Sequence, residues 1–167
     1  MLKSRPTYNE FISANMTKGL HNLTLHDLAK WLDVHDSVYV VTDIKEDNVR
    51  ALKYISERYP SIIKKVIPQI YFFLEYSKVY ELGYHNIILT LYCSSYTDEM
   101  VIEFAKKYPL YAVTMWDYRA KTDFSQRLKQ INIRVYAHTV NDTTEMNKLL
   151  TNGAYGVYTD FLMPRIK

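Results

Sequence analysis

Glycine and cysteine are scarce in this 167-residue chain, and each shortage excludes a class of protein. The four glycines form neither a glycine-rich turn between a strand and a helix nor a Gly-Lys-Ser/Thr phosphate loop, which disfavours an open-sheet nucleotide-binding domain. The one cysteine, Cys93, excludes an intrachain disulfide framework and fits a reducing compartment. A secreted bacterial protein that is poor in cysteine would have the same composition.

Long apolar runs and long basic runs are missing as well. Residues 1–6 contain no apolar run of signal-peptide length, and no later segment approaches the roughly 20 apolar residues that span a bilayer. We therefore expect a soluble, cytoplasmic protein without stable membrane insertion. The net charge is +3, and Lys and Arg are interspersed with Asp and Glu, the longest basic run being Lys64–Lys65. This pattern predicts no nucleic-acid partner.

Hydrophobic residues make up 48% of the chain and charged residues 23%, which is an ordinary globular composition. At this length the chain can bury one hydrophobic core, so we expect a single domain over residues 1–167. Tyrosine is unusually abundant, with 16 residues. We interpret these tyrosines as packing residues whose hydroxyl groups reach water or a polar partner, because no basic groove accompanies them.

Strand and helix patterns alternate along most of the chain. Residues 38–45 begin with uncharged β-branched and aromatic side chains and end with polar ones, which is typical of a strand buried on both faces. Before them, Thr24 and Asp27 match a capping box and predict a helix. Further strand patterns, each after a helix pattern, lie at residues 66–71, 86–92, 111–116, 133–140 and 156–159. This alternation predicts a parallel sheet of βα units, with an irregular second strand because Pro68 has no N–H.

The carboxyl ends of these strands are polar. Alternate side chains of an extended strand share a face, so Asp43 and Lys45 lie side by side at the first strand end. Taken alone, this pair fits an ordinary salt bridge as well as a site. The other strand ends are also polar or aromatic, and a barrel brings such ends to one shared mouth. We therefore expect an α/β fold that is a partial TIM (β/α)₈ barrel of about six parallel βα units.

Three short motifs follow one another in this pattern. Residues 42–45 read Thr-Asp-Ile-Lys, residues 139–142 read Thr-Val-Asn-Asp, and residues 153–164 match Gly-x-x-Gly-x-x-Thr-Asp-x-x-x-Pro. In order and spacing these motifs resemble strand ends of the glycerophosphodiester phosphodiesterase family, which are (β/α)₈ barrels related to phosphatidylinositol-specific phospholipase C. The resemblance covers nearly the whole chain and implies that its six strands are the family's third to eighth.

The chain lacks other motifs of that family. It contains neither the His-Arg-Gly of the first strand nor the Glu-x-Asp of the second, and His35-Asp36 lies in the wrong place for the second catalytic histidine. We therefore expect a barrel without its two N-terminal strands. Such a barrel has exposed strand edges, which favour self-association.

The resemblance implies roles for six strand-end residues. Asp43 matches a metal-ligating carboxylate, and Lys45 matches a catalytic lysine that faces a phosphate oxygen. Four further residues match positions that shape or line the substrate pocket: Gln69, Tyr71, Trp116 and His138. Packing in the barrel wall is an equal alternative for Trp116, and capping of a strand is an alternative for His138. We expect Asp160 to organise the final turn and not to bind metal.

The activity that the resemblance implies is phosphoric diester hydrolysis in lipid metabolism. A glycerophosphodiester would yield glycerol 3-phosphate and an alcohol, with Ca²⁺ or Mg²⁺ and Lys45 neutralising the phosphate oxygens. Because two motifs are missing, we expect this activity to be incomplete in the chain. The alternative is a non-catalytic barrel relative that binds a phosphorylated ligand or a partner chain. A third interpretation, an aldolase or a sugar-phosphate isomerase, is disfavoured by the lack of a glycine-rich phosphate site near the last strands.

Overall fold

The computed structural model describes residues 6–92 and 94–163. Cys93 and Pro164, the last residue of the closing motif, lie outside the described residues. The chain divides into two compact units, Met1–Val38 and Tyr39–Lys167. The expected single domain over residues 1–167 stays a prediction.

Residues 6–38, the described part of the first unit, contain three short helices: α1 (Tyr8–Ser13), η1 (Thr17–Gly19) and α2 (Leu25–Asp33). The predicted capping box of α2 is confirmed, because the Thr24 hydroxyl accepts a hydrogen bond from the Asp27 backbone N–H at 3.1 Å. The Asp27 carboxylate in turn accepts the Thr24 backbone N–H at 3.3 Å. Both N–H groups would otherwise lack a partner at the helix start, so the capping box fixes where α2 begins.

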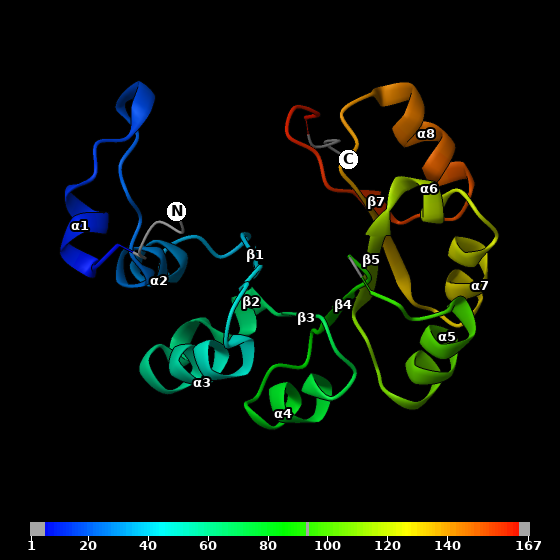
Figure 1. The fold of residues 1–167 in the computed structure, drawn as a ribbon, viewed down its shortest axis with the longest axis horizontal. Coiled ribbons are helices and arrows are strands. Elements are labelled where there is room, and N and C mark those ends of the chain that lie inside the picture. Colours follow the sequence, from blue (N-terminus) through cyan, green and yellow to red (C-terminus); the bar gives the residue numbers. More distant parts are fainter. Residues whose placement is uncertain (1–5, 93, 164–167) are drawn as a thin grey trace. The chain divides into compact units, whose positions relative to one another are not determined.

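The second unit is an α/β fold whose strands are all parallel (Figure 1). Five strands form one sheet in chain order: β3 (Gln69–Ile70), β4 (Ile88–Thr90), β5 (Ala112–Trp116), β6 (Arg134–His138) and β7 (Gly156–Val157). Two more form a second sheet: β1 (Val40–Val41) and β2 (Val66–Ile67). The predicted α/β fold with parallel βα units is confirmed and is consistent with a partial barrel.

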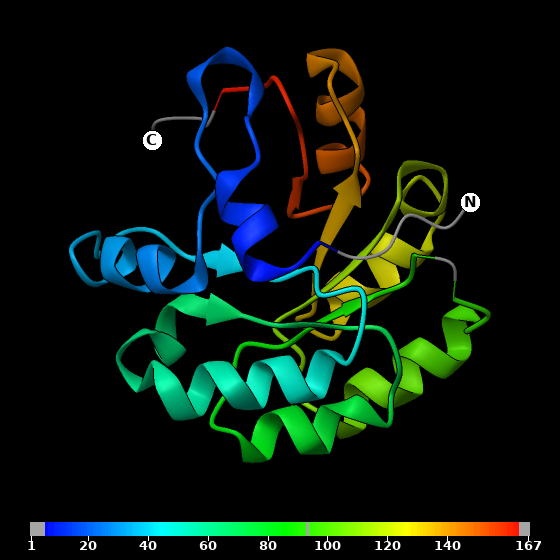
Figure 2. The same cartoon turned by 60° about the vertical axis from the view of Figure 1, so that its left-hand side comes forward.

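Helices connect the strands of this second unit. They are α3 (Asn48–Arg58), η2 (Pro60–Lys65), α4 (Glu75–Glu81), α5 (Asp98–Lys107), α6 (Asp117–Ala120), α7 (Phe124–Gln130) and α8 (Thr143–Thr151). In Figures 1 and 2 these helices lie outside the row of strands, as in a barrel wall. The carboxyl ends of the parallel strands therefore meet at one rim.

Pro68 divides the second predicted strand into β2 and β3, which confirms the expected irregularity. Proline has no N–H, so it cannot donate into a ladder on either side. Its carbonyl still accepts the Ile88 N–H at 2.9 Å, and this bond starts the pairing of β3 with β4. The chain thus changes partners at Pro68, from β1 to β4.

The first strand is shorter and more exposed than the sequence predicts. Of residues 38–45, only β1 is a strand, and Val41 is 39% exposed. Among the described residues β1 pairs with β2 alone, and the last ladder bond runs from the Thr42 N–H to the Ile67 carbonyl at 3.0 Å. The Thr42 carbonyl then accepts the Gln69 side-chain amide instead of a backbone N–H, so the ladder ends there. Self-association through the outer edges of β1 and β7 stays a prediction.

A buried cluster of Ile67, Ile88 and Ala112 fills the inner side of the strands, and Tyr111 and Tyr136 pack against it. Two tyrosine rings thus extend the hydrophobic core. Because each of these residues comes from a strand or from its start, the cluster joins strands that are distant in sequence. Burial of such side chains is the main favourable contribution to folding.

Tyr84 shows most clearly the packing role expected for tyrosine. Its side chain is 1% exposed, and its hydroxyl donates a hydrogen bond to the Leu52 carbonyl at 2.9 Å. Burial raises the pKa of the hydroxyl to about 12. The group therefore stays neutral and bonded inside the fold.

Gly156 leaves room for the ring of Tyr136 on the neighbouring strand. A Cβ atom at residue 156 would lie 2.9 Å from Cε1 of Tyr136, closer than atoms in contact can approach. We expect Gly156→Ala to lower the free energy of unfolding by about 1–3 kcal/mol, because the ring must shift within a packed wall. Urea unfolding measures the change, and a variant as stable as the wild type would contradict this packing.

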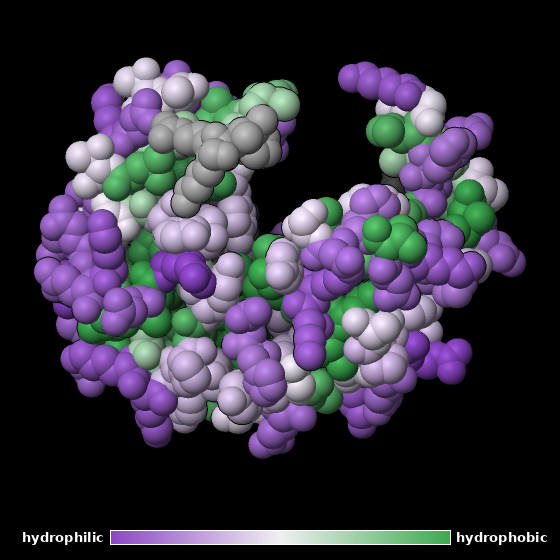
Figure 3. All heavy atoms as spheres, turned by 180° about the vertical axis from the view of Figure 1, so that it is seen from behind, coloured by the Kyte–Doolittle hydropathy of each residue, from purple (hydrophilic) through white to green (hydrophobic). Residues whose placement is uncertain are grey.

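Hydrophilic and hydrophobic side chains are interspersed on the face shown in Figure 3. Some large apolar side chains are nevertheless exposed, among them Phe72 (63%) and Leu74 (85%). Within residues 6–92 and 94–163, no helix has both the length and the apolar character that crossing a membrane requires.

Candidate functional site

The strand ends of the second unit surround a cavity of about 250 Å³, which we call the rim cavity. All six residues with predicted site roles line it: Asp43, Lys45, Gln69, Tyr71, Trp116 and His138. The sequence did not single out the remaining lining residues for such roles: Thr90, Tyr92, Thr139 and Tyr158. The alternation of side chains along parallel strands brings these groups together, because inward residues of neighbouring strands meet at the rim.

Asp43, Lys45 and Tyr71 form a polar cluster on one side of the rim cavity. The Lys45 ammonium lies 2.7 Å from the Asp43 carboxylate, and the Tyr71 hydroxyl donates a hydrogen bond to the same carboxylate. The Lys45 and Asp43 side chains are 66% and 53% exposed, so the pair itself adds little to stability. Water and dissolved ligands can therefore reach the ammonium.

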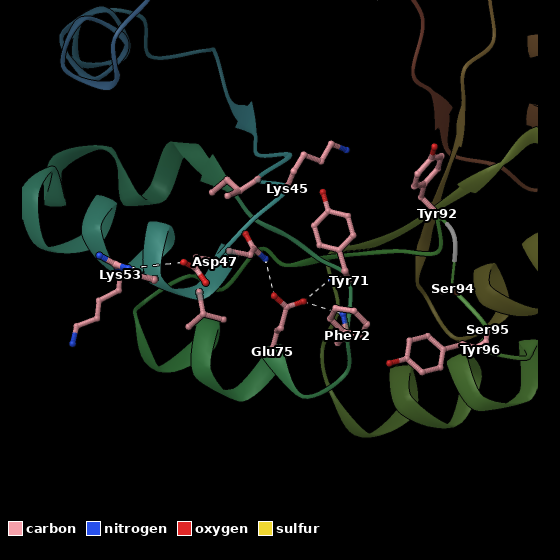
Figure 4. Close-up of a pocket in the computed structure, with 14 residues that line it drawn as sticks. Lys45, Asp47, Lys53, Tyr71, Phe72, Glu75, Tyr92, Ser94, Ser95 and Tyr96 are labelled. Carbon is pink, nitrogen blue, oxygen red and sulfur yellow. Dashed lines mark hydrogen bonds and ion pairs between the residues drawn. The ribbon is translucent and has the colours of Figure 1, made fainter. Parts of the chain in front are cut away.

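The Lys45 ammonium also lies over two aromatic rings. It is 5.9 Å from the centre of the Tyr71 ring and 5.8 Å from that of Tyr92. Figure 4 shows Lys45 extended above Tyr71 in the direction of Tyr92. Cation–π attraction at these distances favours this side-chain position. The cation is thus held over the rim by one carboxylate and two rings.

Burial and the contacts within this cluster determine the ionisation states of Asp43 and Tyr71. Burial alone would raise the pKa of the Asp43 carboxyl, but hydrogen bonds from Lys45 and Tyr71 outweigh burial and hold the pKa below its ordinary value. Burial and the Asp43 carboxylate raise the pKa of the Tyr71 hydroxyl well above its ordinary value. At neutral pH Asp43 is therefore a carboxylate and Tyr71 is a neutral phenol.

Three rings form the opposite side of the rim cavity. The Trp116 ring centre lies 5.1 Å from that of Tyr92 and 4.9 Å from that of His138. Trp116 packs against both rings and yet is 37% exposed at the rim. Trp116 can therefore both pack in the barrel wall and contact a ligand. Its contact with a ligand stays a prediction.

His138 presents a ring nitrogen without a partner. Its Nε2 atom is buried and has no hydrogen-bond partner among the residues that the structure describes. Burial lowers the pKa of the imidazole, while the nearby carboxylates of Asp117 and Asp43 oppose this change. The ring is therefore neutral at pH 7, and Nε2 can bond to a ligand group.

We expect the lowered pKa of His138 to make folding stability depend on pH. The unfolded imidazole, with a pKa near 6.5, takes up its proton before the folded one does. The free energy of unfolding therefore decreases as the pH falls from the pKa of the unfolded imidazole to the lower pKa of the folded one. Between about pH 7 and about pH 5, urea unfolding should show a smaller decrease in the free energy of unfolding for His138→Gln than for the wild type. Equal losses in both proteins would contradict this assignment.

Gln69 has a structural partner. Its side-chain amide donates a hydrogen bond to the Thr42 carbonyl at 2.9 Å, and its backbone N–H donates to the Thr42 hydroxyl at 3.3 Å. Gln69 thus fixes the segment after β1 that carries Asp43 and Lys45. Its predicted contact with a substrate stays a prediction.

The donor groups at the rim do not fit a dedicated divalent-ion site. No group of three or more His, Cys, Asp or Glu side chains that could hold a metal occurs in the described part of the chain. Asp43 is the one carboxylate on the rim cavity, and an ammonium and a phenol already bond to it. A Ca²⁺ ion takes six to eight oxygen ligands, roughly, which this set cannot supply. No chemistry is therefore assigned to a metal.

Asp160 lies in the final turn, as the sequence predicts. Its backbone N–H donates to the Asn141 side-chain carbonyl at 2.8 Å, and its carboxylate accepts from the Asn141 amide at 3.1 Å. The Thr159 hydroxyl donates to the same Asn141 carbonyl at 3.0 Å. These bonds tie the segment after β7 to the end of β6.

A second cavity of about 990 Å³ adjoins the rim cavity and was not predicted. The two cavities share Lys45, Tyr71 and Tyr92. Its other walls come from the start of α3 and from the loops around residues 72 and 95. We call it the loop cavity. No strand periodicity marks loop residues of this kind, so the sequence carried no signal for it.

The chain resembles known proteins in its fold alone. No family model and no curated protein matches the chain. One solved structure, described as "PaMucR Phosphodiesterase, c-di-GMP complex", matches with 11% identity and a TM-score of 0.61, covering 78% of this chain and 63% of its own. The chain thus spans less than two thirds of that protein. A second, a glycerol uptake operon antiterminator regulatory protein from Listeria monocytogenes, matches with 13% identity and a TM-score of 0.53, covering 79% of this chain and 72% of its own.

These findings overturn the family assignment drawn from the short motifs. The two structures described above are not glycerophosphodiester phosphodiesterases, and no family model supports the resemblance. The expected hydrolysis of glycerophosphodiesters and the expected role in lipid metabolism are therefore wrong. The expected binding of Ca²⁺ or Mg²⁺ stays a prediction, which the described donor groups at the rim do not support. The motifs reflect a shared barrel pattern, because polar residues follow parallel strands in barrels of many functions.

Proposed function

We propose that this chain is a binding module that holds a small phosphorylated molecule in the rim cavity without hydrolysing it. The observation that carries the proposal is the position of Lys45, an accessible ammonium held over the cavity by one carboxylate and two rings. Lysine binds phosphate as a point charge. In this proposal Lys45 contacts the phosphate and acts as a binding residue.

The rest of the rim supports the same proposal. Tyr92 and Trp116 offer ring faces to the body of a ligand, and His138 Nε2 is a buried nitrogen that a ligand hydroxyl can bond to. A structure of similar fold was solved as a complex with c-di-GMP, a phosphorylated small molecule. Active sites of barrels lie at the carboxyl ends of the strands, and this is where the rim cavity lies.

The test compares ribose 5-phosphate with ribose by isothermal titration calorimetry. Both are small enough for a cavity of about 250 Å³, and they differ by the phosphate alone. We expect ribose 5-phosphate to bind and to remain intact after incubation, and ribose to show no measurable binding. Equal affinities for the two sugars, or no binding of either sugar, would contradict the proposal.

Asp43 opposes a bound phosphate, and its charge can be removed without changing its shape. We expect Asp43→Asn to tighten the binding of ribose 5-phosphate by about fivefold, because two like charges near 4 Å repel by about 1 kcal/mol even in water. The Tyr71 hydroxyl can still donate to the new amide oxygen. Calorimetry measures the gain, with Asp123→Asn as the control, since Asp123 is an exposed carboxylate outside both cavities. Weaker binding by Asp43→Asn would show that the carboxylate helps to hold the ligand.

A further inference from the structure

The loop cavity is large enough for a part of the ligand that the rim cavity cannot hold. Its volume is about 990 Å³, against about 250 Å³ for the rim cavity. Lys45, Tyr71 and Tyr92 border both, so a molecule whose phosphate lies at Lys45 can extend into the loop cavity. This extension rests on the proposed function, because it takes the phosphate position from it.

One wall of the loop cavity presents an aromatic side chain on a fixed backbone. The Glu75 carboxylate accepts the backbone N–H groups of Tyr71 at 2.7 Å and Phe72 at 2.9 Å (Figure 4). Asn48 Nδ2 donates to the same carboxylate at 3.0 Å, so Glu75 ties this loop to α3. Phe72 nevertheless remains 63% exposed. An exposed ring on a fixed backbone is suited to stacking with a flat ligand group.

A second aromatic side chain, Tyr96, also lines the loop cavity. The Tyr96 ring stacks on Phe73 with ring centres 3.9 Å apart and an interplanar angle of 6°. The Tyr96 hydroxyl accepts the Phe73 N–H at 3.3 Å, which fixes this ring on the loop after β4. The cavity thus has two aromatic side chains in its lining, which suits a planar guest.

Two buried polar atoms in the lining favour a guest that is also polar. Asn48 is 7% exposed, and its Oδ1 atom has no hydrogen-bond partner within the described chain. The Ser94 hydroxyl is likewise buried and lacks a partner there. Such groups are costly unless something bonds to them. An alkyl chain of a lipid would leave both unsatisfied, whereas the edge of a nucleobase carries donors and acceptors.

We infer that the rim and loop cavities form one bipartite site for a nucleotide. The phosphate lies at Lys45, and the base lies in the loop cavity between Phe72 and Tyr96 with its polar edge toward Asn48 and Ser94. The basic side chains that also border this cavity, Arg50 and Lys53, face Asp47 at 3.9 Å and Glu57 at 3.8 Å. Lys45 also pairs with a carboxylate, Asp43 at 2.7 Å, and it is the phosphate contact in this inference because it alone of the three borders both cavities.

Calorimetry with GMP, AMP and ribose 5-phosphate tests the inference. We expect a nucleotide to bind about tenfold or more tightly than ribose 5-phosphate, because stacking of one base contributes on that scale. Phe72→Ala should reduce this advantage to about threefold or less. Phe161→Ala is the control, since Phe161 is 77% exposed and outside both cavities, and it should keep the full advantage. Thermal unfolding confirms that both variants are folded.

The outcomes separate the inference from the proposed function. Equal affinities for nucleotides and ribose 5-phosphate would overturn the bipartite site and leave phosphate binding at the rim intact. A nucleotide advantage that Phe72→Ala does not change would also overturn it, because the base would then lie elsewhere. Binding of none of the three compounds would overturn both.

Discussion

Lys45→Ala should lower the affinity for ribose 5-phosphate by about tenfold or more, since a hydrogen bond to a charged group contributes about 1.5–3 kcal/mol. The ammonium reaches the rim cavity over Tyr71 and Tyr92, and no other lysine or arginine lines that cavity in the described structure. Removing it leaves the phosphate facing Asp43 without a counter-charge. Isothermal titration calorimetry of the wild type and the variant measures the loss.

Lys106→Ala is the matched control. Lys106 lies on α5, its ammonium is 2.8 Å from the Glu103 carboxylate, and it borders neither cavity. Both variants lose one exposed lysine with one carboxylate partner, so both should lose at most about 1 kcal/mol of stability. Only Lys45→Ala should lose affinity. An unchanged affinity in Lys45→Ala would contradict the assigned phosphate position.

The largest effect on stability is expected for Leu89→Ala, in the middle of β4. Leu89 is fully buried, and as the chain neighbour of the inward residues Ile88 and Thr90 it points to the face that the helices cover. Removing the side chain leaves a cavity between strand and helices. We expect the free energy of unfolding to fall by about 2–5 kcal/mol. Urea unfolding followed by circular dichroism measures this change.

Leu74→Ala provides the control for this prediction. Leu74 is 85% exposed, so the same substitution there should change the free energy of unfolding by about 0.5 kcal/mol or less. If Leu89→Ala is as mild as Leu74→Ala, the packing of β4 against the helices is not as described. Such a result would also remove the support for a barrel wall behind the rim cavity.

The position of the candidate site could be predicted because it follows from strand geometry. In parallel strands, side chains two residues apart share a face; Asp43 and Lys45 follow β1 and Tyr71 follows β3, and these side chains meet at the strand ends. The same rule places Trp116 beside His138 on paired strands. Fold class and rim residues were therefore accessible from periodicity, without knowledge of tertiary contacts.

The features that the sequence did not reveal depend on contacts between distant segments. β1 is short because the Thr42 carbonyl bonds to the Gln69 side chain instead of to a backbone N–H of the partner strand. The loop cavity depends on Glu75, which bonds to the Phe72 N–H and to Asn48 of α3. Short motifs suggested a family assignment that the comparisons overturned, since strand-end patterns recur in barrels of unrelated function.

A crystal structure of the chain with ribose 5-phosphate is the most direct test of the proposed binding function. We expect the phosphate within hydrogen-bond distance of Lys45 Nζ and the sugar against the rings of Tyr92 and Trp116. A phosphate bound away from the rim cavity, or a sugar that leaves Tyr92 and Trp116 untouched, would contradict the account.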